Sequence, residues 1–293
     1  MADTPPAPRA WPAIDVTLRP DAVAPADLDD RLALAFDDVA ATAVDGDGAR
    51  RWRAYFDTAD ARGQALAELA GLLGPSFDLA PADVEDEGWA VKVQQELGPV
   101  RAGRFVVAPP WDVPVPAPGE VLILIEPSVG FGTGHHQSTR LCLRALERLA
   151  VAGRTVADIG TGSGVLAIAA SRLGARAVLA LDHDQDAVDA ARDNVVRNGA
   201  ADVVSCAVAD IATADVGRHD IVVANLTVHL LRRFARQIAA ALREGGTLVT
   251  SGFTTDQVAL VLDAFLGFTV VAQDEEDDWA SVTVEGQEMG SRE

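Results

Sequence analysis

The stretch Asp158-Ile159-Gly160-Thr161-Gly162-Ser163-Gly164 joins an apolar run at residues 154–159 to an amphipathic one at residues 164–173. A buried strand that enters a helix through such a turn is typical of α/β proteins that bind a nucleotide-like cofactor. Glycine lets the chain turn sharply and approach a ligand closely, and the helix N-terminus offers N–H groups. A dinucleotide fingerprint places its third glycine three residues after the second. Here the interval is two, which disfavours a nicotinamide oxidoreductase.

The same alternation of strand and helix continues on both sides of this turn. Glycine turns and amphipathic helices between apolar strands are typical of a parallel sheet with crossover helices. The last two strands, at residues 268–271 and 279–284, are separated by the acidic residues 274–278, which are too few for a crossover, so we expect them to pair antiparallel. We therefore predict an α/β domain at residues 121–293 with a seven-stranded, mostly parallel, doubly wound sheet. Its other strands are expected at residues 154–159, 177–182, 203–209, 221–226 and 247–253, and its helices at residues 164–173, 185–198, 228–242 and 256–265.

The first third of the chain has a different pattern. Strands near residues 14–18, 51–56 and 77–84 alternate with helices at residues 27–43 and 61–73. This order predicts a small α/β sandwich of ferredoxin-like type at residues 1–85. Prolines accumulate between residues 99 and 119, and neither a helix nor a central strand tolerates them. We therefore predict a linker at residues 86–120.

Polar side chains stand where three of the predicted strands end. Asp182 lies 22 residues after Gly160, where a carboxylate can accept both hydroxyls of a ribose. Asp210 follows the next strand and could bind an adenine amine, although capping of its own loop explains it equally well. Asn225 ends the strand after that, at the edge where cofactor and acceptor should meet; the alternative is an ordinary turn residue.

The segment from Glu126 to Thr139 precedes a helix predicted at residues 141–149. It contains Gly130-Phe131-Gly132-Thr133-Gly134-His135-His136-Gln137-Ser138-Thr139. Glycines around an aromatic side chain, followed by imidazoles and hydroxyls, are expected of a loop that folds over a ligand. Helix capping by Ser138 or Thr139 is the competing explanation. His135 and His136 complete no recognisable ligand set, so no metal site is predicted.

Together, the segments 130–139, 158–164 and 225–226 resemble the PrmA family, the bacterial methyltransferases of ribosomal large-subunit protein eleven. The resemblance covers about residues 85–285 and extends to Trp89 and to segments 98–100, 105–111 and 278–279. It implies a sheet of the class I methyltransferase type and S-adenosylmethionine as cofactor. It also implies that the cofactor is contacted by Thr139, Gly160, Asp182 and Asn225, to which the glycine turn and the strand ends add Gly162 and Asp210. The chain departs from the family at residues 126–129 and 227–229, which flank the expected acceptor site.

The activity that the resemblance implies is methylation of lysine side-chain and N-terminal amines, with the first domain recognising the substrate protein. A neutral amine would attack the sulfonium methyl directly. The Asn225 oxygen or the Leu226 carbonyl could orient that amine, and Phe131 would exclude water. No dedicated general base is evident, and the candidates are His135, His136 and His229.

Composition bears on partners and location. The chain has 44 acids, 24 bases and a net charge of −20, which disfavours nucleic acid as a direct partner. Residues 1–120 hold 21 acids and 10 bases, so we expect electrostatic capture of a basic ribosomal protein, although acidity that serves only solubility is the alternative. With no signal peptide or membrane-length apolar run, we expect a soluble, cytoplasmic monomer that binds no membrane. The alternative functions are a small-molecule N-methyltransferase and a catalytically silent nucleotide-binding adaptor.

Overall fold

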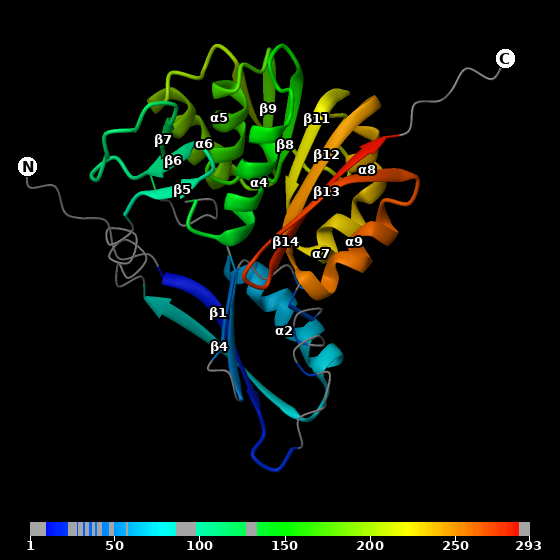
Figure 1. Cartoon of the computed structure of the whole chain (residues 1–293). Helices are drawn as coiled ribbons and strands as arrows, with labels where there is room; N and C mark the ends of the chain where they lie inside the picture. Colours follow the sequence, from blue (N-terminus) through cyan, green and yellow to red (C-terminus); the bar gives the residue numbers. More distant parts are fainter. Residues whose placement is uncertain are drawn as a thin grey trace, which may run out of the picture. The chain divides into compact units, whose positions relative to one another are not determined.

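The computed structural model describes residues 10–22, 28, 32, 35–36, 39, 43–46, 50–56, 58–85, 98–126 and 134–286. The chain divides into two compact units, residues 1–93 and residues 94–293 (Figure 1). No helix in these described ranges is long and apolar enough to span a membrane.

The second unit is built on a seven-stranded sheet with the order β10-β9-β8-β11-β12-β14-β13, which confirms the predicted fold class. Neighbouring strands are parallel from β10 to β12, and β14 is antiparallel to both β12 and β13. The strands are β8 (Thr155–Ile159), β9 (Ala177–Asp182), β10 (Val204–Val208), β11 (His219–Asn225), β12 (Leu242–Thr254), β13 (Phe268–Glu276) and β14 (Trp279–Gly286).

Helices cover both faces of this sheet, as expected of a doubly wound fold (Figure 1). Alternate residues of each central strand point to opposite faces, so that in β11 Val223 packs with α4 and α5, whereas Val222 packs with α7, α8 and α9. The helix predicted at residues 228–242 is instead two short helices that meet at Phe234. The helices are α4 (Gln137–Arg148), α5 (Val165–Arg172), α6 (Gln185–Arg197), α7 (Val228–Arg233), α8 (Ala235–Ala240) and, after the 3-10 turn η1 (Thr255–Gln257), α9 (Val258–Ala264).

The structure differs from the predicted linker over residues 98–120. A three-stranded sheet occupies part of this region, with β5 (Val100–Ala102) antiparallel to β6 (Phe105–Ala108) and β6 parallel to β7 (Val121–Leu124). Phe105 and Val107 are fully buried in the same hydrophobic cluster as α4 and α5. Burial of this apolar run removes its side chains from water, which stabilises the fold, whereas an exposed linker would leave them in water. Most of the prolines lie after β6, at residues 109–110 and 114–118. Because they are so frequent in this region, the sequence predicted a linker rather than strands.

The first unit contains a four-stranded antiparallel sheet with the order β2-β3-β1-β4, which is the order of a ferredoxin-like sandwich. Its elements are β1 (Ala10–Leu18), β2 (Ala43–Gly46), β3 (Arg51–Tyr55), α2 (Ala59–Leu73) and β4 (Phe77–Glu85). Ile14 and Val16 of β1 and Leu69 of α2 are buried in one core. Strand β2 is not predicted from the sequence, because Asp45 and Gly46 are residues typical of a turn. In the structure they are the last two residues of β2, which pairs antiparallel with β3.

The burial of β6 can be tested by truncation of Phe105. Removing a fully buried phenyl ring should lower the free energy of unfolding by about 3–5 kcal/mol. Val115, which is 92% exposed in the proline-rich part of the same region, is the matched control, and its replacement by Ala should change that free energy by less than about 0.5 kcal/mol. Urea unfolding of both variants measures the difference. Equal, small effects would mean that residues 100–108 are a connection outside the core.

Candidate active site

The predicted site residues lie at the carboxyl ends of β9, β8 and β11. From β8 the chain moves outward through β9 to β10 and then returns to β11 on the other side of β8, so the strand order reverses between β8 and β11. Ligands of open α/β sheets bind outside the carboxyl ends of the strands at such a reversal. Gly160 follows β8 there, while Asp182 and Asn225 are the last residues of β9 and β11.

The glycine turn after β8 is shaped for close approach. Gly160 has a φ of +73°, in the left-handed region, and a Cβ at that position would lie 2.5 Å from Cδ2 of Leu226. The N–H of Gly160 donates to the Leu181 carbonyl at 2.8 Å, and the N–H of Gly162 donates to Oδ2 of Asp182 at 3.0 Å. These two glycines, both with positive φ, therefore form a tight turn, which at Gly160 packs closely against Leu226, and their N–H groups are used to hold it rather than left free.

Asp158 holds the turn from inside. Its Oδ2 accepts hydrogen bonds from Thr161 Oγ1 at 2.7 Å and from the Ala167 N–H in α5 at 3.1 Å. Burial raises the pKa of Asp158 to about 6, although these two hydrogen bonds favour the carboxylate. The other carboxylate oxygen, Oδ1, is thus buried without a hydrogen-bond partner in the part of the chain that the structure describes.

Asp182 presents an ionised carboxylate at the end of β9. Its Oδ1 accepts the N–H of Asp184 at 3.2 Å and lies 3.2 Å from Nδ1 of His183. Burial alone would raise the pKa of Asp182, but the hydrogen bonds from His183, Gly162 and Asp184 outweigh it and hold that pKa below its usual value. Each carboxylate oxygen can accept more than one hydrogen bond. The arrangement therefore suits a ligand that offers two neighbouring hydroxyls.

Asn225 is brought together with Thr139, 86 residues away in the chain. Nδ2 of Asn225 donates to Oγ1 of Thr139, in the first turn of α4, at 3.4 Å. The Oδ1 of Asn225 is buried and lacks a partner in the part of the chain that the structure describes. The next residue, Leu226, donates its N–H to the Ser251 carbonyl at 3.0 Å, which ties the end of β11 to β12. The site thus contains an oriented amide oxygen that is ready to accept a hydrogen bond.

Helix capping does not explain the hydroxyls of Ser138 and Thr139. The N-cap of α4 is His136, whose Nδ1 accepts the N–H of Ser138 at 3.3 Å. Burial, with a smaller contribution from Arg140, lowers the pKa of His136, so its imidazole is neutral near pH 7. Both hydroxyl side chains are buried, and that of Thr139 faces Asn225.

Two other predicted residues stand apart from this group. Asp210 is exposed after β10, and its Oδ1 accepts the N–H of Ala212 at 2.8 Å, so it caps its own loop as the alternative interpretation proposed. The structure assigns no hydrogen bond within its described residues to the second carboxylate oxygen of Asp210, Oδ2. Phe131 lies outside the described residues. No group of three or more metal-ligating side chains occurs within the ranges that the structure describes.

Asn194, which the sequence patterns did not single out, connects the glycine turn to β7. It is buried on α6, where its Nδ2 donates to the Ser163 carbonyl at 3.0 Å and its Oδ1 accepts the N–H of Glu126 at 2.9 Å. Asn198, one helical turn later, pairs with both the N–H and the carbonyl of Leu124. The sequence does contain a pattern that could have identified them: Asn194 and Asn198 continue the helical spacing of the buried Ala187, Ala191 and Val195.

The raised pKa of Asp158 predicts a pH dependence of stability. Between about pH 4 and pH 6 the folded protein holds a proton that the unfolded chain releases, so this group's contribution to stability falls as the pH rises through that window. The total change is about 3 kcal/mol, at 1.36 kcal/mol per pH unit. We expect the unfolding free energy of the wild type, relative to Asp158→Asn, to decrease by about this amount between pH 4 and pH 7 in urea titrations. Parallel pH profiles for the two proteins would refute the assignment.

Comparison with known proteins agrees with this architecture. The family model described as ribosomal protein L11 methyltransferase (PrmA) matches residues 28–287. A ribosomal protein L11 methyltransferase of Geobacter sulfurreducens is 41% identical over 241 residues, 78% of this chain and 79% of that protein. One of Pelotomaculum thermopropionicum is 39% identical over 244 residues, 80% of this chain and 79% of that protein.

A solved structure supports the same assignment. The crystal structure of a ribosomal protein L11 methylase from Lactobacillus delbrueckii subsp. bulgaricus is 29% identical to this chain. It superimposes with a TM-score of 0.61 over 65% of this chain and 100% of that one. The sheet order, the glycine turn and these matches lead to one conclusion: the chain belongs to the ribosomal protein L11 methyltransferase (PrmA) family.

Proposed function

We propose that this protein transfers methyl groups from S-adenosylmethionine to lysine side-chain and N-terminal amines of a basic ribosomal protein, L11. The observation that carries the proposal is the buried Oδ1 of Asn225, an acceptor without a partner among the described residues, at the strand end beside the glycine turn. Family membership supplies the reaction class and the acceptor.

The described residues fit the cofactor. Asp182 offers an ionised carboxylate that can accept the two ribose hydroxyls, and the unsatisfied Oδ1 atoms of Asp158 and Asn225 can accept N–H donors directly or through water. Gly160 and Gly162 are assigned to the close approach of the cofactor, because neither has a side chain and both adopt positive φ, and Thr139 orients the Asn225 amide. Asp210 is assigned to the adenine amine through the oxygen that its loop does not use. When bound, S-adenosylmethionine supplies a methyl group activated by its sulfonium, and S-adenosylhomocysteine is what remains of it after the transfer.

The acceptor must reach this site as a neutral amine. At pH 7 a lysine with a pKa of about 10.4 is deprotonated at a cost of roughly 4.6 kcal/mol, and an α-amine with a pKa near 8 at about 1.4 kcal/mol. A pocket of low polarity lowers the pKa of the amine by disfavouring its charged form. The Asn225 Oδ1 or the Leu226 carbonyl then accepts an N–H and directs the nitrogen lone pair. Phe131 is assigned to the exclusion of water, and the departing proton passes to solvent.

The first unit is assigned to capture of the substrate protein. Residues 1–93 carry 18 acids and 8 bases, so this smaller unit has more net negative charge per residue than the rest of the chain. A negative surface attracts a lysine-rich protein and accelerates its encounter with the enzyme. In this proposal the chain acts as a cytoplasmic monomer that binds neither nucleic acid nor membranes directly.

Transfer of labelled methyl groups tests the function. Wild-type protein, radiolabelled S-adenosylmethionine and hypomethylated ribosomal proteins should give one labelled band, which mass spectrometry identifies as L11. Asn225→Ala should retain the fold and lower turnover by about 10²-fold, because the amine loses its alignment. Raising the salt concentration should raise KM for the protein acceptor and leave kcat unchanged.

The possible outcomes separate the alternatives. Label on free amines but on no protein would identify a small-molecule N-methyltransferase. Binding of S-adenosylhomocysteine with no transfer to any acceptor would identify a silent adaptor. Near-normal turnover of Asn225→Ala would remove Asn225 from its assigned role and leave the methyltransferase assignment standing.

A further inference from the structure

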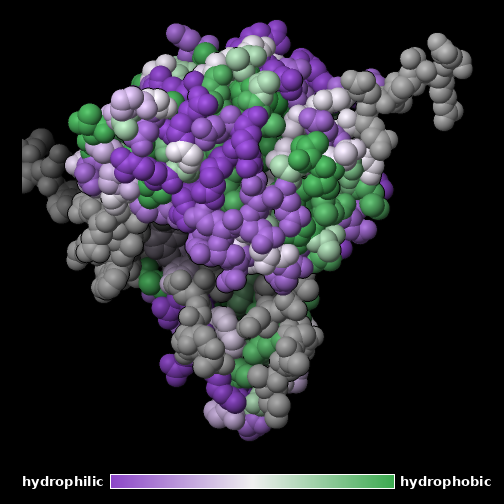
Figure 2. Space-filling view, viewed as in Figure 1, coloured by the Kyte–Doolittle hydropathy of each residue, from purple (hydrophilic) through white to green (hydrophobic). Residues whose placement is uncertain are grey.

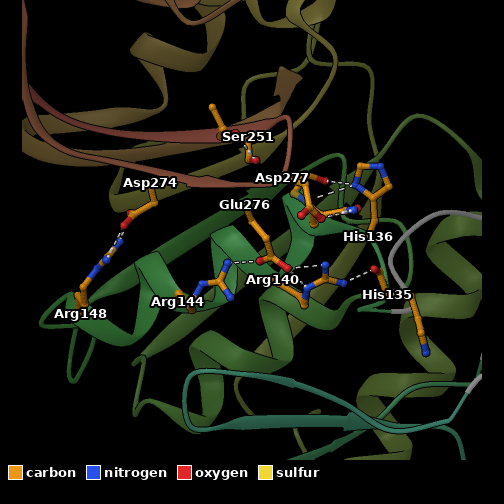
Figure 3. Close-up of polar contacts among 12 residues, drawn as sticks. His135, His136, Arg140, Arg144, Arg148, Ser251, Asp274, Glu276 and Asp277 are labelled. Atoms are coloured by element: carbon orange, nitrogen blue, oxygen red, sulfur yellow. Dashed lines mark hydrogen bonds and ion pairs between the residues drawn. The ribbon is translucent and has the colours of Figure 1, made fainter. Parts of the chain in front are cut away.

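Charged side chains connect α4 to the edge strand β13, outside the group of residues assigned to the site. Arg140 and Arg144 of α4 both pair with Glu276, and Arg148 pairs with Asp274 (Figure 3). In the space-filling view hydrophilic residues cover the middle of this face of the second unit, and a hydrophobic patch lies to their right (Figure 2). The paired arginines lie one helical turn apart, so one face of α4 follows the strand.

Arg140 differs from the other two arginines in what it joins. Its Nε lies 2.6 Å from Oε1 of Glu276, and its Nη1 donates to the backbone carbonyl of His135, just before α4. Its side chain is 16% exposed, compared with 50% for that of Arg148. The rigid guanidinium fork therefore fixes the start of α4 to β13 in a partly buried setting, where such contacts are strongest.

The two residues before α4 are held from other directions as well. Nε2 of His135 lies 2.9 Å from the carbonyl oxygen of Gly98. The His136 ring meets the Trp279 ring edge to face, with centroids 4.2 Å apart. Gln137 adds a bond from its Nε2 to Oδ2 of Asp277 at 3.1 Å. The first turn of α4 is thus fixed in both position and rotation.

That first turn carries a residue of the proposed site. Thr139 precedes Arg140 in the chain, and its hydroxyl accepts the Asn225 Nδ2–H at 3.4 Å. The N–H groups of Thr139 and Arg140 both donate to the His136 carbonyl, at 3.1 and 3.2 Å. A shift of His135 or His136 would therefore move Thr139 away from Asn225 and release the Asn225 amide.

We propose that Arg140 is a positioning residue for cofactor binding. Its assigned role is indirect: through Glu276 and the His135 carbonyl it sets the start of α4, and so the contact between Thr139 and Asn225. The inference rests on the proposed function only in taking S-adenosylhomocysteine as the ligand.

Three variants test the proposal. Arg140→Ala removes both contacts, and Arg140→Lys keeps a positive charge near Glu276 but lacks the fork that also reaches His135. Arg148→Ala is the matched control, because it breaks an arginine–carboxylate pair between the same two elements about two helical turns beyond Arg140. Isothermal titration with S-adenosylhomocysteine, thermal unfolding and hydrogen exchange of the ligand-free protein are measured for each.

We expect Arg140→Ala to raise Kd at least about tenfold and Arg140→Lys to recover only part of the loss, with Arg148→Ala within twofold of the wild type. KM for S-adenosylmethionine should rise in Arg140→Ala while KM for the protein acceptor stays constant. Amides of residues 137–140 should exchange faster in ligand-free Arg140→Ala than in Arg148→Ala. If Arg140→Ala unfolds, Arg140→Lys carries the same comparison.

Two results would overturn the proposal. One is wild-type Kd and unchanged amide exchange in the Arg140 variants, and the other is equal losses in Arg140→Ala and Arg148→Ala. A wild-type protein that binds no S-adenosylhomocysteine would instead contradict the proposed function, and the exchange measurement would still decide the role of Arg140.

Discussion

The buried carboxylate of Asp158 is the constraint on which the site depends. It accepts hydrogen bonds from Thr161 in the glycine turn and from Ala167 in α5, so one side chain fixes how the strand passes into the helix. Asn194 then ties the same turn, at Ser163, to Glu126, the second residue after β7. The raised pKa of Asp158 is the cost of placing this carboxyl in a closed core, and its unsatisfied Oδ1 lies in the same surroundings.

Around this turn the site is assembled from distant segments that hold one another. Thr139 reaches Asn225 from α4, and Arg140 links the start of α4 to β13, near the end of the chain. The antiparallel β13–β14 pair therefore does more than complete the sheet, because it supports a helix whose first turn lies in the proposed active site. Most of the predicted site residues are small, and they are kept in place by larger side chains, such as that of Arg140, that lie outside the site.

Local patterns in the sequence predicted the glycine turn, the strand ends and the doubly wound sheet, because each depends on residues close together in the chain. The missed features depend on tertiary partners. Strand β13 runs through Glu276, beyond the predicted end at residue 271, because its backbone stays paired with β14 as far as Glu276 opposite Trp279. The acidic side chain at that end is held by Arg140 and Arg144, more than 130 residues away in the chain. Likewise, residues 105–108 form a buried strand because β7 and α4 cover them, which proline density alone could not reveal.

In the proposed site the carboxyl edge of β9, β8 and β11 binds the cofactor, with its ribose on Asp182. Calorimetric titration of Asp182→Ala with S-adenosylhomocysteine tests this assignment of Asp182, with Asp189→Ala on the exposed side of α6 as control. We predict a Kd raised about 10- to 100-fold for Asp182→Ala, the loss of a charged hydrogen-bond acceptor worth about 1.5–3 kcal/mol, and an unchanged Kd for the control. A Kd within twofold of the wild type for Asp182→Ala would show that the ribose does not bind to Asp182.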